Sequence, residues 1–334
     1  MKKAKAIALL SGGLDSILAV KLMMDLGLQV IAVNMETPFC HADGEDARHP
    51  QIASDKLKVP LRKIRVGQEY MEMVKNPRHG YGKNMNPCID CRVFLFREAK
   101  RIMEEEGAAF VFTGEVLGER PMSQRRDAMN LIERESGLKG RVLRPLSARL
   151  LEPTVMEQEG LVDRNRLLDI QGRSRKPQLA LARRYQIDYF PGPAGGCLLT
   201  DPAFARKLKE SIEHGEDSDR HITLLKVGRH FRTPSGAKII AGRDKGENEE
   251  LMGLARPDEP KFTAHGQKST YVLLLGNSGE EDRLLAARVC ARYSDAKEAG
   301  EVSVRTWLDS PSEFELIRVR PLEESLLSSF RAGG

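Results

Sequence analysis

The 334-residue sequence lacks any apolar run approaching the roughly 20 residues that a membrane-spanning helix requires, which argues against an integral helical membrane protein. Its start, MKKAKAIALLSGG, is apolar only from Ala6 to Leu10, too short for a secretory signal, so we expect a cytoplasmic protein. Aromatic residues make up only 5%, which disfavours an RNA-binding protein built on rows of stacked rings. Cysteines number five, and in a reducing cytosol they serve metal binding or catalysis more often than disulfides.

The net charge of +5 is too small to indicate nucleic-acid binding by itself, but the charge is unevenly distributed. Residues 206–334 carry 21 basic and 22 acidic side chains, whereas residues 141–186 carry ten basic and five acidic ones. A basic segment of this kind is typical of a solvated helix face, and a phosphate-contacting RNA surface has the same composition. The densest part contains Arg173, Arg175, Lys176, Arg183 and Arg184.

The order of elements predicts an α/β fold with a doubly wound parallel sheet. A buried strand at Ala6–Leu10, a helix at Leu14–Leu26 and a strand at Leu28–Asn34 imply a right-handed crossover between parallel strands. We expect residues 68–87 to form a mobile substrate loop ahead of a helix at Cys91–Glu106. Further strands are expected at Leu61–Val66, Ala109–Thr113 and Val142-Leu143, and a further helix at Gln51–Leu57.

A polar stretch near residues 205–218 predicts the end of this first domain. We therefore expect an N-terminal domain over residues 1–205 and a second, smaller α+β domain over residues 218–330. Strand character is expected through His221–Gly242. Two further strands are expected at Thr270–Leu275 and Val302–Trp307, with a helix at Asp282–Tyr293 between them.

The segment Ser11-Gly12-Gly13-Leu14-Asp15-Ser16 lies between the first strand and the first helix. The glycines permit a tight turn that brings N–H groups close to an anion, and the helix N-terminus adds partial positive charge. The lysine of the kinase-type phosphate loop is missing, so the segment suits a pyrophosphate better than γ-phosphoryl transfer.

This segment resembles the signature of the PP-loop, or N-type ATP pyrophosphatase, superfamily, whose members adenylate a substrate oxygen and then replace AMP with a nitrogen or sulfur nucleophile. The resemblance implies that Ser11, Gly12, Gly13, Asp15 and Ser16 bind the ATP phosphates. It also implies that Asp15 helps to place Mg²⁺. The end of the second strand, Val33 to Met35, would hold the adenine.

Three cysteines have surroundings that suggest chemistry. Cys88 and Cys91 form a CxxC pair ahead of a helix, and Cys197 follows two glycines. Three thiolates suit a [4Fe–4S] cluster with one open iron, Zn²⁺ with a fourth ligand, or a redox dithiol, and spacing alone does not separate these. Cys40 lacks comparable surroundings, and Cys290 is expected to be a buried structural thiol.

The segment Asn86-Pro87-x-x-x-Cys91 resembles the catalytic-cysteine motif of bacterial tRNA 2-thiouridylases, with Cys197 as the counterpart of their second cysteine. Many of those proteins have Asp where this chain has Cys88, and PP-loop thiolases with three-cysteine clusters form a known family type. The resemblance thus implies that Cys88, Cys91 and Cys197 hold a [4Fe–4S] cluster that presents the sulfur. The competing family mechanism makes Cys197 a persulfide carrier and Cys91 the thiol that releases the sulfur.

A second motif, TGEVLGERPMSQ at residues 113–124, follows a buried strand, and Leu143-Arg144-Pro145-Leu146 follows later. Both resemble segments of tRNA 4-thiouridine synthases, although Glu119 stands where glutamine is usual. Because ligands bind at the carboxyl ends of parallel strands, we expect the loop that begins at Gly114 to face the nucleotide. Ser123 and Gln124 are expected to contact the nucleotide or the target uridine. Arg144 is expected to balance phosphate charge.

Residues 218–325 resemble the NFACT-R domain through GRHF at residues 228–231 and GAKIIAGR at residues 236–243. Members of that family are associated with RNA binding, and a structural or dimerising role stays open because the net charge here is −1. We expect five exposed cations on this domain: Lys226, Arg229, Arg232, Lys238 and Arg243.

Together the resemblances predict an ATP-dependent tRNA sulfurtransferase that makes 4-thiouridine at position 8. The alternatives are 2-thiouridine at the wobble position and a PP-loop enzyme acting on a small molecule. The expected ligands are ATP, Mg²⁺ and a [4Fe–4S] cluster, with Zn²⁺ as a weaker candidate. The expected partners are tRNA, a sulfur donor (sulfide or a cysteine desulfurase persulfide) and a second copy of the chain, with no membrane.

Overall fold

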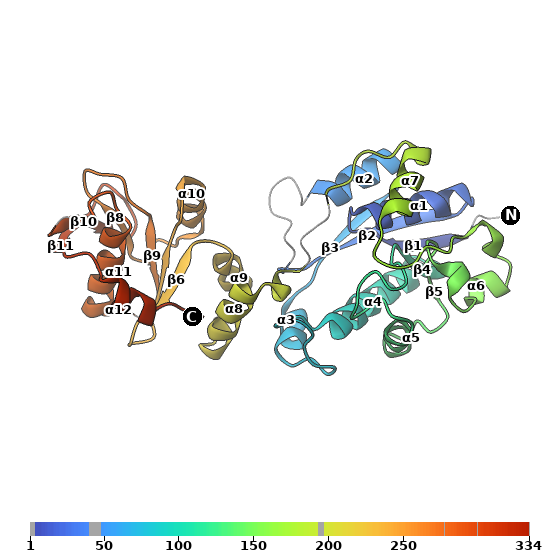
Figure 1. Cartoon of the computed structure of the whole chain (residues 1–334), viewed down its shortest axis with the longest axis horizontal. Helices are drawn as coiled ribbons and strands as arrows, with labels where there is room; N and C mark the ends of the chain where they lie inside the picture. The colour runs from blue at the N-terminus through green and yellow to red at the C-terminus, as the bar shows by residue number, and fades with distance from the viewer. Residues whose placement is uncertain (1–3, 40–47, 193–196, 277, 299, 334) are drawn as a thin grey trace. The chain divides into compact units, whose positions relative to one another are not determined.

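The computed structural model describes residues 4–39, 48–192, 197–276, 278–298 and 300–333 (Figure 1). The chain divides into two compact units, Met1–Thr200 and Asp201–Gly334. The division coincides with the start of a helix, where the Asp201 side chain accepts a hydrogen bond from the N–H of Phe204. The boundary expected at 205–218 lies further along the chain, within and after this helix.

A parallel sheet forms the centre of the first unit. Its strand order among the described residues is β3-β2-β1-β4-β5, and every neighbouring pair is parallel, which confirms the predicted fold class. The register pairs Ile7 with Ile31 on one side and with Val111 on the other. The strands are β1 (Lys5–Leu9), β2 (Gln29–Glu36), β3 (Leu61–Arg65), β4 (Phe110–Thr113) and β5 (Val142–Leu143).

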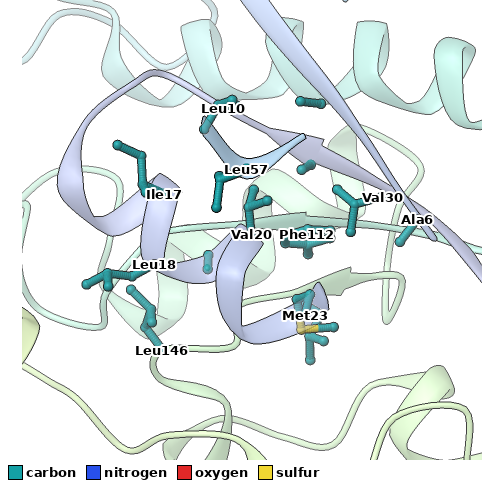
Figure 2. Packing of buried hydrophobic residues seen from close by; sticks show 14 of the residues in the cluster. Ala6, Leu10, Ile17, Leu18, Val20, Met23, Val30, Leu57, Phe112 and Leu146 are labelled. Carbon is teal, nitrogen blue, oxygen red and sulfur yellow. The ribbon is translucent and has the colours of Figure 1, made fainter. Parts of the chain in front are cut away.

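Helices cover both faces of this sheet, because successive residues of each buried strand point to opposite faces. Ala6 and Ala8 pack with Ile17 of α1, in the cluster shown in part in Figure 2, whereas Ile7 packs with Phe96 of α4. The first layer contains α1 (Leu14–Asp25), α2 (His49–Leu57) and α7 (Lys176–Tyr185). The second contains α4 (Cys88–Glu105) and α5 (Arg126–Glu135), with α3 (Gln68–Lys75) packed on α4.

The expectation of a loop over residues 68–87 is wrong in its first half, which forms helix α3. Tyr70, Met71 and Val74 are buried along one side of this helix, and this packing outweighs the polar composition of the segment. The remaining short elements of the first unit are α6 (Val155–Gln158) and three 3₁₀ turns: η2 (Ala148–Leu150), η3 (Arg164–Arg166) and η4 (Leu198–Thr200).

The second unit contains an antiparallel sheet with the order β11-β10-β8-β9-β7-β6 among its described residues, which confirms the expected α+β domain. Its strands are β6 (Arg229–Arg232), β7 (Lys238–Ala241), β8 (Lys261–Ala264), β9 (Val272–Leu275), β10 (Val302–Trp307) and β11 (Glu315–Val319). Its helices are α8 (Pro202–Glu213), α9 (Asp219–Leu225), α10 (Lys245–Leu254), α11 (Glu280–Arg292) and α12 (Glu324–Ser329).

Strand character begins later than predicted in this unit, because residues 219–225 form helix α9. The Ser218 side chain caps the helix by accepting from the N–H of His221, and Ile222 and Leu225 are buried. Capping and packing therefore outweigh the strand preference of the Ile-Thr pair.

The prediction of five exposed cations in this unit is wrong for most of them. Lys238 is buried and binds Glu210 and Glu216, and the half-buried Arg232 binds the same two carboxylates. Arg229 lies over the ring of Tyr293. Among these cations, Arg243 is the one with an exposed side chain. Ion pairs between elements distant in the chain remove Lys238 and Arg232 from the surface, and a cation–π contact partly covers Arg229.

Among the residues that the structure describes, no helix combines the length and the hydrophobicity needed to cross a membrane.

Candidate functional site

The loop between β1 and α1 is held in place by close backbone packing. Gly12 has a φ of +79°, and a Cβ there would lie 2.6 Å from the backbone nitrogen of Pro50. A Cβ at Gly114, just after β4, would lie 2.4 Å from the backbone of Asp15 and Ser16. Both glycines are therefore needed for the chain to pass this closely.

Two serine hydroxyls lie within the loop itself. The Ser16 hydroxyl donates to the Gly13 carbonyl at 2.8 Å, and the Ser11 hydroxyl lies 3.3 Å from that of Ser16. Gly13 is the N-cap of α1, and its N–H group lies 3.4 Å from the Ser11 hydroxyl. The loop therefore has the polar groups of an anion site at a helix N-terminus.

A cavity of about 190 Å³ opens at this loop, along the carboxyl ends of β1, β2 and β4. The structure brings together most of the residues that the sequence analysis placed at the nucleotide: Ser11, Gly13, Asp15, Ser16, Val33, Met35, Gly114 and Gln124 line it. Glu119, to which the sequence analysis gave no role, lines it as well. Gly12 and Ser123 are not among its lining residues. Gly12 packs against the start of α2, and the buried Ser123 contacts the Cys88 thiol at 3.8 Å.

Two carboxyl groups, those of Asp15 and Glu119, line the same cavity. Burial raises the pKa of Asp15, although the nearby Arg175 and Arg120 oppose the change. The pKa of Glu119 is also raised, by burial and by the charge of Asp15. Asp15 Oδ1 is buried with no hydrogen-bond partner among the described residues. Such an orphaned oxygen beside a second carboxylate fits a site for a hard cation such as Mg²⁺.

A buried network of ion pairs, which the sequence analysis did not predict, lies beside the cavity and contributes Arg92 and Glu115 to its lining. Arg92 Nε lies 3.3 Å from Glu115 Oε1, and Arg144 Nε lies 3.0 Å from Glu115 Oε2. Arg144 also binds Glu133. Burial opposes ionisation of Glu115, but the charges of Arg92 and Arg144 outweigh it and lower its pKa. Arg92 lines the cavity. Arg144 was expected to balance phosphate charge, but it does not line the cavity and instead forms an ion pair with Glu115.

Cys88 and Cys91 lie in the first turn of α4, where the helix N-terminus favours a negatively charged sulfur. The Tyr70 hydroxyl of α3 lies 3.1 Å from the Cys91 thiol. Arg92 follows Cys91 directly. Burial acts to lower the pKa of the Arg92 guanidinium. The charges of Glu115 and of the Cys91 and Cys88 sulfurs outweigh burial, so the pKa is raised. The thiols and the cavity therefore share one guanidinium.

Asp90, one of the two residues between the thiols, holds the preceding loop in place. Asp90 is buried and accepts a hydrogen bond from the N–H of His79 at 3.0 Å, while the His79 ring also lies 3.0 Å from Asp90 Oδ1. The other ring nitrogen of His79 lies 3.3 Å from Glu135 of α5. These contacts hold the segment before Cys88 against two helices.

Cys197 belongs to a segment that is hydrogen-bonded to the same region. Its thiol lies 3.6 Å from the carbonyl oxygen of Phe39, whose ring centroid lies 6.3 Å from that of Tyr70. The N–H of Met85 donates to Leu199 and the Asn84 side chain donates to Thr200, at 3.2 and 2.8 Å. The segment after Cys197 therefore contacts the loop that leads to Cys88.

The described residues contain no group of three His, Cys, Asp or Glu side chains arranged to hold a metal ion, so the three thiols do not converge as they stand. Cys88, Cys91, Cys197 and Cys290 form no disulfide. Cys290 is fully buried, as predicted, and burial raises its pKa to about 12. Cys40, His41, Gly195 and Gly196 lie outside the described residues.

The basic segment is mostly exposed. Arg173, Lys176, Arg183 and Arg184 lie on the surface around α7, whereas Arg175 is half-buried and acts electrostatically on Asp15 and Glu119 in the cavity. The loop before it is joined to the second motif, because the N–H of Gly172 donates to Leu117 at 2.7 Å. The part of the basic segment around Gly172 and Arg175 therefore lies beside the cavity.

Comparisons with known proteins match the two units to different families. Residues 1–150 match the family described as thiamine biosynthesis protein (ThiI), and residues 228–331 match the NFACT protein RNA binding domain. A probable tRNA sulfurtransferase of Methanothermobacter thermautotrophicus is 34% identical over 125 residues, which cover 35% of this chain and 30% of that relative. The chain thus spans under a third of that relative's length.

Two further likenesses extend the comparison. The tRNA-specific 2-thiouridylase MnmA of Leptospira biflexa is 26% identical over 297 residues, which cover 83% of this chain and 70% of that protein. A crystal structure of a 4-thiouridine synthetase–RNA complex with bound ATP is 27% identical and covers 43% of this chain and 36% of that one, but its TM-score of 0.35 is too low to support statements about the site. Residues 1–150 of this chain are therefore similar to the ThiI family and to tRNA-thiolating relatives, and residues 228–331 are similar to the NFACT RNA-binding domain family.

Proposed function

We propose that this chain is an ATP-dependent tRNA sulfurtransferase, which adenylates a uridine oxygen and then replaces AMP with sulfur. One observation carries the proposal: Arg92 lines the phosphate-loop cavity and directly follows Cys91 in the first turn of α4. The group that would meet the nucleotide and the thiols that would handle sulfur are therefore neighbours on one helix. The family match and the two kinds of tRNA-thiolating relatives support the same reaction.

The first step activates the base, because a carbonyl oxygen is a poor leaving group. The uridine oxygen attacks the α-phosphorus of ATP, an O–P bond forms, and the bond to pyrophosphate breaks. In the proposal, the loop amides, Ser11 and Ser16 bind the phosphates, and Arg92 balances charge that develops on them. Asp15 and Glu119 would hold Mg²⁺, which when bound neutralises phosphate charge.

In the second step, sulfur displaces AMP. A sulfur nucleophile forms a bond to the activated ring carbon, and the bond from that carbon to the AMP oxygen breaks. In the proposal, Arg92 would stabilise both the departing AMP and an anionic sulfur beside Cys88 and Cys91; its place in the cavity lining and its electrostatic interaction with both sulfurs support this role. The Tyr70 hydroxyl would hold the Cys91 sulfur in position.

We further propose that Cys88, Cys91 and Cys197 hold a [4Fe–4S] cluster, with Zn²⁺ as the weaker candidate. The donor set fits a cluster with one iron left open, which would supply a site for inorganic sulfide. The hydrogen bonds that join residues 197–200 to residues 84–86 support this grouping, although Cys197 must approach the other two thiols to complete it. Anaerobic purification with iron and acid-labile sulfide analysis tests it: each Cys→Ser variant should lose the iron.

A persulfide route is the alternative. There Cys197 receives sulfur from a cysteine desulfurase as a persulfide. Cys91 attacks the inner sulfur, the persulfide S–S bond breaks, and the outer sulfur leaves as the hydrosulfide that displaces AMP. The Cys91–Cys197 disulfide that forms must be reopened by a thiol reductant. Iron-free wild-type protein that thiolates tRNA only with a desulfurase and a reductant would favour this route.

For the product, we propose 4-thiouridine at position 8 of tRNA, on the strength of the TGEVLG and LRPL segments and the sulfurtransferase relatives. The second candidate is 2-thiouridine at the wobble position, favoured by the Asn86-Pro87-x-x-x-Cys91 motif and by the long match to a 2-thiouridylase. Mass spectrometry of nucleosides from treated tRNA separates the two, because the isomers have different retention times and fragment patterns.

The proposed activity is tested by pyrophosphate release. We expect release from ATP and Mg²⁺ to rise at least ten-fold when unmodified tRNA is added, and Asp15→Asn to abolish the increase. The matched control is Asp25→Asn, at the far end of α1, which should leave the increase intact. Release that is independent of tRNA but stimulated by a metabolite would instead indicate a small-molecule enzyme.

A further inference from the structure

The sheet of the C-terminal unit is unequally covered. One face packs on α11 and α12, through buried residues such as Val302, Val304 and Val319. The other face is covered over β7 and β9, where Ile240 and Leu273 pack with Leu224 and Leu251 of α9 and α10. Over β10 and β11 this second face stays accessible, because Leu316 is 53% exposed and Phe314, just before β11, is 38% exposed.

The register identifies the side chains on this accessible part. Arg305 of β10 pairs with Thr263 of β8 and with Leu316 of β11. Ser303 pairs with Arg318, and its carbonyl accepts a hydrogen bond from the N–H of His265. We name the surface formed by Thr263, His265, Ser303, Arg305, Phe314, Leu316 and Arg318 the open face.

Two rings and a guanidinium lie together on the open face. The ring centroids of His265 and Phe314 are 5.8 Å apart with an interplanar angle of 35°, and the Arg305 guanidinium lies 5.5 Å from the Phe314 centroid. Arg305 Nη2 donates to Thr263 at 3.3 Å. Its Nε is buried and has no hydrogen-bond partner among the described residues. Arg305 is thus fixed beside an exposed ring.

The strand residues of the open face include two cations, Arg305 and Arg318, and no carboxylate. Glu315 of β11 belongs to the opposite face, where it binds Arg283 of α11 at 3.0 Å. Two exposed carboxylates, Glu301 and Glu313, directly precede β10 and Phe314 in the chain. The strands therefore present positive charge on this face, although the net charge over residues 206–334 is −1. Exposed rings combined with cations suit a polyanion whose flat bases are accessible.

We propose that the open face binds single-stranded RNA, with bases stacked on Phe314 and His265 and phosphates near Arg305 and Arg318. A duplex hides the faces of its bases, so the rings select an unpaired segment. The inference rests on the proposed function only in taking RNA as the partner. The aromatic content of the whole sequence disfavoured an RNA-binding protein built on rows of stacked rings. That average does not show that folding brings the rings of His265 and Phe314 together.

The test measures binding of a fluorescent 12-nucleotide single-stranded RNA, and of the matching duplex, to the full chain by anisotropy. Phe314→Ala removes a stacking ring and should weaken single-strand binding roughly ten-fold while leaving duplex binding unchanged. Arg318→Gln should weaken it several-fold and make it less dependent on salt. Met252→Ala and Lys245→Gln change exposed residues on α10 and should have no effect.

Unchanged single-strand binding by both open-face variants would overturn the proposal. It would also be overturned if Phe314→Ala weakened duplex and single-strand binding equally, or if the variants altered sedimentation as a dimer and not RNA affinity. Far-UV circular dichroism of each variant checks that the domain is folded. The two proposals can fail separately. Unchanged RNA binding by the open-face variants, with tRNA-dependent pyrophosphate release intact, would contradict this inference alone. Absence of tRNA-dependent pyrophosphate release in the wild type, with RNA binding that depends on the open face, would contradict the proposed function alone.

Discussion

The Tyr70 hydroxyl lies 3.1 Å from the Cys91 thiol, although the two residues belong to different helices. Tyr70 is almost completely buried, and its ring packs edge-on against Phe94 with centroids 5.3 Å apart. The hydroxyl is therefore held in one place by packing, and it fixes where the sulfur lies. This contact exists only because residues 68–75 fold into a helix.

Replacement of Tyr70 by phenylalanine keeps the packed ring and removes the hydroxyl. A hydrogen bond to a charged group contributes about 1.5–3 kcal/mol. Without the hydroxyl, the thiolate form of Cys91 loses this stabilisation, so a smaller fraction of the sulfur is reactive. Alkylation of Cys91 by iodoacetamide at pH 7 should therefore slow roughly ten-fold. Peptide mass spectrometry measures alkylation at each cysteine. Tyr185→Phe on α7 is the control and should leave the rate unchanged. An unaltered rate in Tyr70→Phe would show that the hydroxyl does not act on the thiol.

Glu115 is predicted to be the most costly carboxylate to remove from the first unit. Glu115→Gln leaves the guanidinium groups of Arg92 and Arg144 without their shared counter-charge, and breaking a buried ion pair costs about 3 kcal/mol or more. Urea unfolding followed by circular dichroism measures the loss. The exposed pair Lys100–Glu104 provides the control, because Glu104→Gln should change stability by less than about 1 kcal/mol. Equal losses of stability for the two variants would show that the ion pairs of Glu115 contribute no more to stability than an exposed pair.

Gly114→Ala should impair nucleotide binding. The new Cβ would lie 2.4 Å from the backbone of Asp15 and Ser16, so the phosphate loop must shift. We expect ATP affinity, measured by calorimetry, to fall at least ten-fold. Gly253→Ala in α10 is the control: nothing lies within 4 Å of its Cβ, and helix propensity favours alanine. Normal ATP affinity in Gly114→Ala would place the nucleotide elsewhere.

The second unit should lose stability in acid through Glu216. Burial opposes its ionisation, but hydrogen bonds and charge from Arg232 and Lys238 outweigh burial and lower its pKa to about 2. A lowered pKa in the folded state means that the stabilisation is complete above about pH 4.5 and is lost as pH falls toward 2. Fluorescence of Trp307, the single tryptophan, reports urea unfolding of this unit.

Between pH 5 and pH 3 the wild type should therefore lose more stability than Glu216→Gln. The exposed Glu249 supplies the control variant, Glu249→Gln, whose pH dependence should match that of the wild type. Parallel curves for wild type and Glu216→Gln would show that this carboxylate does not carry the acid sensitivity.

Local signals in the sequence were sufficient for the first strand–helix–strand unit and the glycine-rich loop. The continuous apolar run of β1 and the turn requirement at Gly12 act over a few residues, so they are visible in the sequence. The parallel pairing of β1 and β2 followed from the strand–helix–strand order, whereas the order of the five strands was not predicted. Most of the predicted nucleotide residues then met at one cavity because strand carboxyl ends share an edge of the sheet.

Contacts between distant segments were not predictable in this way. Arg92 looked like one more charged residue of an amphipathic helix, and nothing local indicated that Glu115 would bind it. Arg144 was expected to balance phosphate charge. The structure pairs it instead with Glu133 of α5, a helix that the sequence analysis did not predict as its neighbour. Lys238 was expected on the surface for the same reason: two carboxylates from other elements bury it.

The most direct test of the central claim is the thionucleoside content of tRNA incubated anaerobically with the reconstituted protein, ATP, Mg²⁺ and sulfide. Wild-type protein should form thiouridine, whereas Cys91→Ser should form none and still release pyrophosphate when tRNA is added, because adenylation precedes sulfur transfer. Thiouridine formed at the wild-type rate by Cys91→Ser would contradict the claim that these thiols and the phosphate-loop cavity act in one reaction.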